Sequence, residues 1–259
     1  MGHVICIASQ KGGTGKTTTA VNMAASFALF EKKTLVVDCD PLGNATTAFG
    51  VNKARISRGL FHALTGKTSF FDVMVETGLP FLSLIPANYD LFFIENKETP
   101  ATDHALILRN FIITAIKKYE YIIIDSPPSL GYLTACALSV SDFLIIPTQR
   151  RIFSFEGLNQ LLSLVNRVRA GANPNLKIAG ILFTMIEDDW RASYEAVPDF
   201  LVSLKGSLFN TVIPWDTTVA DASDFGKPGV LYDIGAPGPS AYLQLAEEMH
   251  LKLSSITVK

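Results

Sequence analysis

Short apolar segments recur along the chain and predict buried β-strands. They are rich in β-branched residues and end at glycine, proline or acidic residues. Continuous apolar segments of this length are typical of parallel strands that are covered on both faces. The predicted strands comprise residues 3–9, 34–38, 80–87, 121–125, 142–147, 176–184 and 208–214.

The segments between these strands have the spacing of helices. Residues 17–30 place Val21, Ala24, Ala25 and Ala28 on one helix face. The alternation of strands and helices predicts an α/β fold, a mostly parallel twisted sheet with helices on both faces. Ligands of such sheets bind at the carboxyl ends of the strands. The other predicted helices comprise residues 104–119, 155–171 and 240–255.

Composition narrows the class of protein. The 259 residues are 48% hydrophobic, and no repeat or linker divides them, so we expect one domain over residues 1–259 without a helix-turn-helix extension before the first strand. The first residues lack the pattern of a secretory leader, so secretion is not expected, and no apolar run reaches roughly 18 residues. Its scattered cysteines, Cys6, Cys39 and Cys136, are typical of buried thiols in a reducing compartment. We therefore expect a cytoplasmic protein. Because the net charge is −2, any contact with nucleic acid would have to come from a local basic patch.

The segment SQKGGTGKTT, residues 9–18, lies between the first predicted strand and the first predicted helix. Its glycines allow the backbone N–H groups to surround phosphate oxygens at a helix N-terminus. Lys16 is expected to contact the β- and γ-phosphates, Thr17 to bind Mg²⁺ and Thr18 to assist at the α-phosphate. The predicted nucleotide-binding residues of this loop are Lys11, Gly12, Gly13, Thr14, Gly15, Lys16, Thr17 and Thr18.

Three acidic residues end predicted strands at the same edge of the sheet. Asp125 ends an apolar strand, the arrangement of a Walker-B acid that binds Mg²⁺. Asp38 and Asp40 follow the apolar segment TLVV, and their spacing lets one support the metal and the other the attacking water. Because each acid alone is also compatible with simple capping of a strand end, the prediction rests on all three together.

These residues carry a family resemblance. The segments KGGTGKTTTAVNMAASFA, VVDCDPLGNATTAFG, IIIDSPPSLGYLTACAL and GKPGVLYD resemble the ParA/Soj branch of the ParA/MinD ATPases, and the likeness runs almost end to end. The resemblance implies a P-loop NTPase of the deviant Walker A type that binds ATP and Mg²⁺ as a sandwich dimer. It implies that Lys11 reaches the partner's phosphates, that Asp40 positions the hydrolytic water, that Asp125 is the Walker-B acid, and that Asp38 lies near the metal. Lys11, Lys16 and Asp40 would then be the catalytic residues.

The resemblance also implies a biological role. Members of this branch bind nonspecific DNA as the ATP-bound dimer, and a ParB-like adaptor stimulates slow hydrolysis and releases them. The expected function is therefore plasmid or chromosome partition, with hydrolysis of ATP to ADP and phosphate and a nucleoid-associated location.

Several positions depart from the branch. Leu42 replaces its usual glutamine, Trp215 replaces the arginine of its IPR segment, and Arg150 and Arg151 follow TQ. The resemblance places the segment after that strand near adenine, so Pro214 and Trp215 are candidate base contacts, although packing explains Trp215 equally well. The candidate DNA contacts are Arg150, Arg151, Arg167, Arg169, Arg191 and Lys205, although each is also compatible with an ordinary solvated charge.

Alternatives from other classes stay open at this point. A positioning ATPase for a protein cargo shares these motifs. A MinD-like membrane switch needs a basic amphipathic C-terminal helix, and the tail LKLSSITVK is short and weakly patterned, so no membrane is expected. A metabolic P-loop enzyme such as a dethiobiotin synthetase needs a small-molecule pocket for which no motif is present. An iron–sulfur carrier needs paired cysteines, and Cys136 has no second cysteine nearby.

Overall fold

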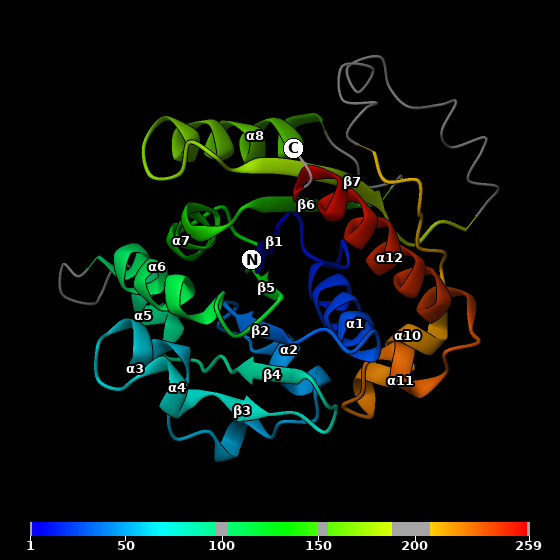
Figure 1. Cartoon of the computed structure of the whole chain (residues 1–259), viewed down its shortest axis with the longest axis horizontal. Coiled ribbons are helices and arrows are strands. Elements are labelled where there is room, and N and C mark those ends of the chain that lie inside the picture. Colours follow the sequence, from blue (N-terminus) through cyan, green and yellow to red (C-terminus); the bar gives the residue numbers. More distant parts are fainter. Residues whose placement is uncertain (1, 97–102, 150–154, 188–207, 258–259) are drawn as a thin grey trace.

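The computed structural model describes residues 2–96, 103–149, 155–187 and 208–257, and it contains a seven-stranded sheet (Figure 1). The strand order is β3-β4-β2-β5-β1-β6-β7, and every neighbouring pair is parallel except β3 with β4. The strands are β1 (His3–Ile7), β2 (Thr34–Asp38), β3 (Val75–Glu76), β4 (Leu82–Ile85), β5 (Tyr121–Asp125), β6 (Phe143–Thr148) and β7 (Lys177–Phe183). The predicted α/β fold is confirmed.

Helices cover both faces of the sheet, as Figure 1 shows. Along β1, Ile5 and Ile7 pack into one core while Val4 and Cys6 pack into the other, so both faces of the strand are buried. One core contains α1 (Lys16–Leu29), α2 (Asn44–Ala48), α10 (Thr217–Asp224), α11 (Gly229–Tyr232) and α12 (Pro237–Thr257). The other contains α3 (Leu60–Leu64), α4 (Phe70–Val73), α5 (Leu91–Glu95), α6 (His104–Ala115), α7 (Tyr132–Val140) and α8 (Phe155–Ala170).

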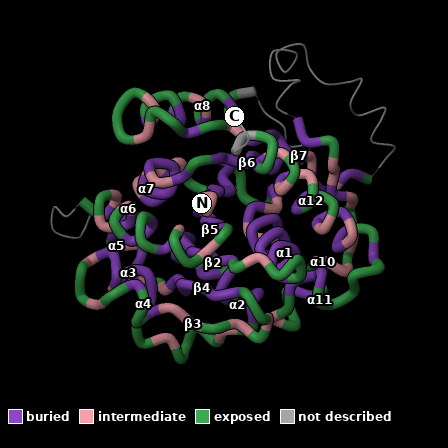
Figure 2. The backbone as a smooth tube through the Cα atoms, viewed as in Figure 1, coloured by how far each residue is buried: buried purple, intermediate pink, exposed green. Residues whose placement is uncertain are grey.

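The register of the central strands positions the site. Asp125 at the end of β5 pairs with Ile7 at the end of β1 and with Asp38 at the end of β2. All three strands therefore end at one edge of the sheet. Figure 2 shows that the strands in the middle of the sheet are largely buried. The loop that follows Ile7 and the acids of β2 and β5 consequently face the same space.

One predicted strand is wrong. Residues 208–214 form no regular strand, and their pairing consists of two isolated parallel bridges, Ile181 with Leu208 and Ile186 with Pro214. The reason is that Glu248 of α12 accepts hydrogen bonds from the backbone N–H groups of Asn210 and Thr211, both at 2.8 Å. Those donors are then not available to a strand ladder.

The short helices were not predicted from the sequence. Helices α2, α3, α4, α5, α10 and α11 span four to eight residues each, too few for a helical period to stand out. The 3₁₀ turn Lys53–Arg55 and the two-residue strand β3 are shorter still.

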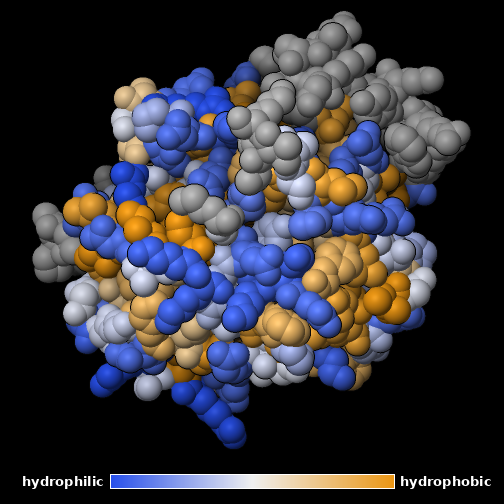
Figure 3. Space-filling view, in the orientation of Figure 1, coloured by the Kyte–Doolittle hydropathy of each residue, from blue (hydrophilic) through white to orange (hydrophobic). Residues whose placement is uncertain are grey.

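The surface carries several large apolar side chains. Tyr89, Phe225 and Trp215 are 72%, 67% and 58% exposed. Figure 3 shows apolar residues gathered in separate areas of the face drawn, with hydrophilic residues across its centre. No helix in the described part of the chain is long and apolar enough to cross a membrane.

Candidate nucleotide-binding site

The glycines of the loop between β1 and α1 leave room beside the backbone. Gly13 and Gly15 have φ angles of 74° and 83°, in the left-handed region that favours glycine. A Cβ added at Gly12 or Gly13 would meet no described atom within 4 Å, so the space next to both residues is open. An open concave backbone of this kind matches the predicted phosphate cradle.

Helix α1 begins at this loop without a side-chain cap. Gly15 is its N-cap residue, and no described side chain accepts a hydrogen bond from the first turn there. The N-terminal N–H groups of a helix need an acceptor, and the helix dipole favours an anion at this position. The loop and the first turn of α1 can therefore bind phosphate together. Thr18 lies half-buried in this turn, and its carbonyl accepts a hydrogen bond from Asn22.

Lys16 is buried against its own loop. It is 6% exposed, and its Nζ donates a hydrogen bond of 2.9 Å to the carbonyl of Lys11. Burial lowers the pKa of the Lys16 ammonium, while Asp125 and Asp40 act to raise it. An ammonium held by one neutral carbonyl gains from a phosphate oxygen, because charge-assisted hydrogen bonds are the stronger ones.

Thr17 and Asp125 form the centre of the site. The Thr17 hydroxyl donates to Asp125 Oδ2 at 2.8 Å, and Asp125 is fully buried. Asp125 Oδ1 has no hydrogen-bond partner within the described residues. Burial, and then the neighbouring Asp38, raise the pKa of Asp125 well above its usual range. A buried carboxylate oxygen without a partner is suited to a cation or its water ligands.

This arrangement fits Mg²⁺ bound together with a nucleotide. Within the described residues, no three histidine, cysteine or acidic side chains are grouped closely enough to hold a metal alone. Mg²⁺ usually keeps several waters and binds through one or two carboxylates plus substrate phosphates. Thr17 and Asp125 offer the hydroxyl and the carboxylate that such a site needs.

Asp38 and Asp40 lie on the neighbouring strand end. Asp38 accepts hydrogen bonds from the backbone N–H and the hydroxyl of Thr46, at 2.8 and 2.7 Å, and from Asp40 N–H at 3.2 Å. Burial raises the pKa of Asp38 to about 6. Asp40 is 5% exposed and accepts from Leu42 N–H at 2.9 Å, and burial raises its pKa as well.

The other wall of the site brings in residues that the sequence did not indicate. Thr184, directly after β7, donates to the carbonyl of Thr14 at 3.0 Å, and Gln149 donates to the carbonyl of Gly13 at 2.6 Å. The backbone N–H of Trp215 donates a hydrogen bond to the carbonyl of Ile186 at 2.9 Å. The IPW segment therefore lies beside the end of β7, which contacts the loop. Thr184 and Gln149 were not among the predicted site residues, because each contacts the loop across many residues of sequence.

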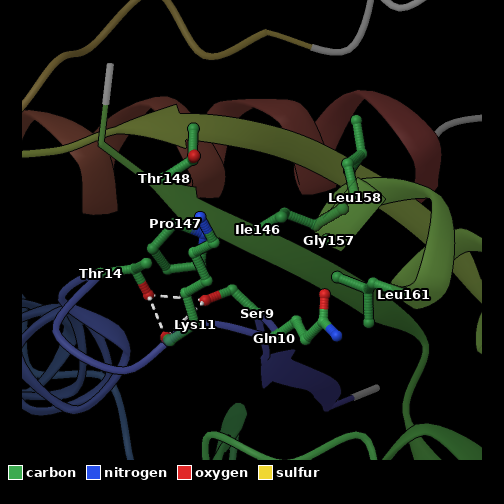
Figure 4. Close-up of a pocket in the computed structure, with 10 residues that line it drawn as sticks. All are labelled: Ser9, Gln10, Lys11, Thr14, Ile146, Pro147, Thr148, Gly157, Leu158 and Leu161. Carbon is green, nitrogen blue, oxygen red and sulfur yellow. Dashed lines mark hydrogen bonds between the residues drawn. The ribbon is translucent and has the colours of Figure 1, made fainter. Parts of the chain in front are cut away.

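Lys11 lies at the mouth of the loop and lines a pocket on the α8 side of it (Figure 4). The loop residue Thr14 shares hydrogen bonds with the hydroxyl of Ser9 and the carbonyl of Lys11. Lys11 itself is exposed. The pocket is completed by the end of β6 and the start of α8, with Ile146, Pro147, Thr148, Gly157, Leu158 and Leu161.

Two of the six candidate DNA contacts, Arg167 and Arg169, lie within the described residues. Arg167 is exposed on α8, whereas Arg169 is half-buried and its Nε donates to the carbonyl of Leu176 at 2.8 Å. Arg169 is therefore already used within the fold. The other candidates, Arg150, Arg151, Arg191 and Lys205, lie outside the described residues.

Known proteins resemble this chain in sequence and in fold. Residues 2–178 match the family model described as an AAA domain. The chain is 38% identical to the chromosome partitioning protein ParA of Myxococcus xanthus, covering 96% of this chain and 88% of the relative. It is 37% identical to the sporulation initiation inhibitor protein Soj of Bacillus subtilis, covering 96% and 98%. Among solved structures, the cobyrinic acid a,c-diamide synthase of Mycobacterium smegmatis with a bound ATP analogue and magnesium is 27% identical, covers 95% of this chain and 93% of that chain, and has a TM-score of 0.79.

Proposed function

Because this chain belongs to the ParA/Soj family of partitioning ATPases, we propose that it is an ATP-dependent switch that positions or segregates DNA. The observation that carries the proposal is the meeting of Lys16, the Thr17–Asp125 pair and Asp40 at one edge of the sheet. Within the ATPase cycle, Lys16 would leave the Lys11 carbonyl to hold the β- and γ-phosphates. Asp40 would orient the attacking water.

Magnesium is proposed to bind with ATP at Thr17 and Asp125, with Asp38 nearby. Mg²⁺ neutralises charge on the phosphates and orients them for in-line attack. The loop residues Gly12, Gly13, Thr14 and Gly15 would hold the phosphates through backbone N–H groups, with Thr18 at the α-phosphate. The open space beside Gly12 and Gly13 supports this placement.

We further propose that Lys11 acts across a nucleotide-dependent homodimer. The carbonyl of Lys11 is tied to Lys16, while its side chain is exposed at the mouth of the loop. A cation that enters from a second copy would stabilise charge during phosphoryl transfer. Lys11→Ala is then expected to retain most ATP binding but to lose dimer formation and turnover. Sedimentation with a slowly hydrolysed ATP analogue measures dimer formation, and a steady-state assay with ATP measures turnover.

Pro214 and Trp215 are proposed to flank the base. Trp215 is 58% exposed, and its backbone N–H binds the carbonyl of Ile186, which supports this placement. Because the chain contains two tryptophans, Trp190→Phe isolates the emission of Trp215. Addition of ATP should quench or shift that emission. Unchanged emission under saturating ATP would assign Trp215 to the surface alone.

Binding to nonspecific DNA and release by a ParB-like adaptor complete the proposal, with a nucleoid-associated location in the cytoplasm. The test is duplex DNA binding without nucleotide, with ADP and with ATP, at two salt concentrations. Binding that needs ATP and weakens with salt is the expected result, because phosphate contacts release counterions. If ATP-dependent dimers form but do not bind DNA at either salt concentration, a protein cargo or a lipid surface is favoured instead. Pull-down and vesicle sedimentation distinguish these two.

A further inference from the structure

Glu95 joins two segments that follow different strands. It is the last residue of α5, which follows β4, and α5 contacts α7, which follows β5 (Figure 1). Its Oε2 accepts a hydrogen bond of 2.8 Å from the backbone N–H of Leu133, and its Oε1 accepts one of 2.6 Å from the Ser129 hydroxyl. Both donors belong to the segment that begins immediately after Asp125.

The carboxylate replaces a missing helix cap. The N-cap residue of α7 is Gly131, which has no side chain to accept from the first turn. Leu133 lies in that first turn, so Glu95 supplies the acceptor from 38 residues earlier in the chain. A negative side chain at a helix N-terminus is also favoured by the helix dipole.

Gly131 leaves the space that this carboxylate needs. A Cβ built on Gly131 would lie 1.8 Å from Glu95 Oε1 and 2.7 Å from Glu95 Cδ. The backbone of Gly131 has a φ of −84°, so no left-handed conformation demands glycine there. A side chain at position 131 would therefore have to displace the Glu95 carboxylate from its present position.

The loop between Asp125 and α7 is fixed at both ends by these contacts. At its start, the Ser126 hydroxyl donates to the carbonyl of Ile7 at 2.8 Å. At its end, Ser129 and Leu133 are held by Glu95, and the carbonyl of Ser129 also accepts from Thr134 Oγ1 at 2.7 Å.

We propose that Glu95 is a positioning residue for ATP hydrolysis, which acts by holding the 126–131 loop next to Asp125, and that Gly131 is its matched partner. Loss of the Glu95 carboxylate leaves the far end of the loop held at Ser129 by Thr134 alone, so the surroundings of Asp125 are less ordered during turnover. None of the hydrogen bonds described above for the phosphate-binding loop involves Glu95, so ATP binding should change little. The inference uses the ATPase activity alone and does not depend on the proposed DNA binding or adaptor.

A double-mutant cycle tests the pairing. Steady-state hydrolysis is measured without DNA for Glu95→Ala, Gly131→Ala and the double variant. Each single variant should lower kcat roughly tenfold with the KM for ATP within about twofold, the size expected for loss of a charged hydrogen-bond acceptor. The kcat of the double variant should lie within about twofold of that of Glu95→Ala, because the methyl group added at position 131 finds free space once the carboxylate is gone. Additive losses, or a rise in KM with unchanged kcat, would overturn the proposal.

Rescue and exchange measurements separate positioning from simple loss of stability. Glu95→Gln keeps an acceptor for Leu133 N–H and should retain most of the activity. Hydrogen exchange of the Leu133 amide should be faster in Glu95→Ala but close to the parent in Glu95→Gln. Ser69→Ala removes the side-chain cap of α4, a contact to Phe71 N–H elsewhere in the fold, and should leave turnover unchanged. Equal exchange of Leu133 in parent and Glu95→Ala would also contradict the proposed clamp.

Discussion

Asp38 and Asp125 occupy equivalent places on neighbouring strands, yet their surroundings differ. They pair in register at the ends of β2 and β5, and both are fully buried. Asp38 uses both oxygens, with three hydrogen bonds from Thr46 and Asp40. Asp125 uses one oxygen, toward Thr17, and within the described residues its other oxygen has no partner.

The difference indicates that the two aspartates have different roles. Thr46 belongs to α2, and its hydroxyl also accepts from Ala87 N–H at 3.0 Å. Asp38 therefore connects the end of β2 to α2 and to the segment after β4, which is a contribution to the fold. Asp125 keeps an acceptor directed at the place where the metal and its waters are proposed. Buried polar groups that lack a partner are costly to stability and are found where a function requires them.

The largest effect is expected for hydrolysis in Asp125→Asn. Loss of the carboxylate should lower the ATPase rate by about 100-fold or more, because charge stabilisation at the transferring phosphate depends on the metal. The nucleotide-free fold should be no less stable, since Asn removes a buried charge that has one hydrogen bond. Urea unfolding together with the ATPase assay checks both halves. A clear loss of stability would place Asp125 among the structural residues with Asp38.

Asp38→Asn should show the opposite balance. The carboxylate of Asp38 now accepts hydrogen bonds from Thr46 and Asp40 with both of its oxygens, whereas an amide has only one oxygen that can accept. The free energy of unfolding should therefore fall by about 1–3 kcal/mol. The ATPase rate should fall less than in Asp125→Asn. Thr46→Val removes the hydroxyl from the same cluster and should destabilise without adding fully to Asp38→Asn in the double variant. If Asp38→Asn left stability unchanged while it abolished turnover, Asp38 would belong with the metal site.

The sequence predicted Asp125 and Asp38 equally well but could not separate them. Both end long apolar strands, and the loop at residues 9–18 is a local motif, so the strands, α1 and the glycine loop could be read from neighbouring residues. Thr46 and Glu95 act on partners 8 and 38 residues away, and nothing in their local spacing marks them. The apolar segment 208–214 resembled a strand because hydropathy does not reveal that Glu248 binds its N–H groups.

The stability of the protein is expected to fall as the pH rises, because both buried acids have raised pKa values. Without Mg²⁺ and nucleotide, the raised pKa of Asp38, about 6 against an ordinary 3.8, means that the folded state binds more protons than the unfolded state in this interval. This contribution is complete below about pH 4 and is lost as the pH rises through about 6, with a slope of at most about 1.4 kcal/mol per pH unit for one group. Asp125 has a pKa raised in the same direction and adds to the loss. Urea unfolding between pH 4 and 8 should show a shallower decline in Asp38→Asn, and an unchanged slope would exclude Asp38 as the source.

The smallest effect is expected at Leu42, which tests whether Asp40 resembles Asp38 in being held by its own chain. Asp40 Oδ1 accepts from the backbone N–H of Leu42, while the Leu42 side chain is 50% exposed. Leu42→Gln should therefore change stability by less than about 0.5 kcal/mol and the ATPase rate by less than about twofold. Leu42→Pro removes the N–H group and should lower the rate more, because Asp40 loses its hydrogen bond. If glutamine altered turnover as much as proline did, the side chain at position 42 would contribute to the placement of the water. The function of Asp40 would then depend on a neighbouring side chain as well as on the backbone N–H of residue 42.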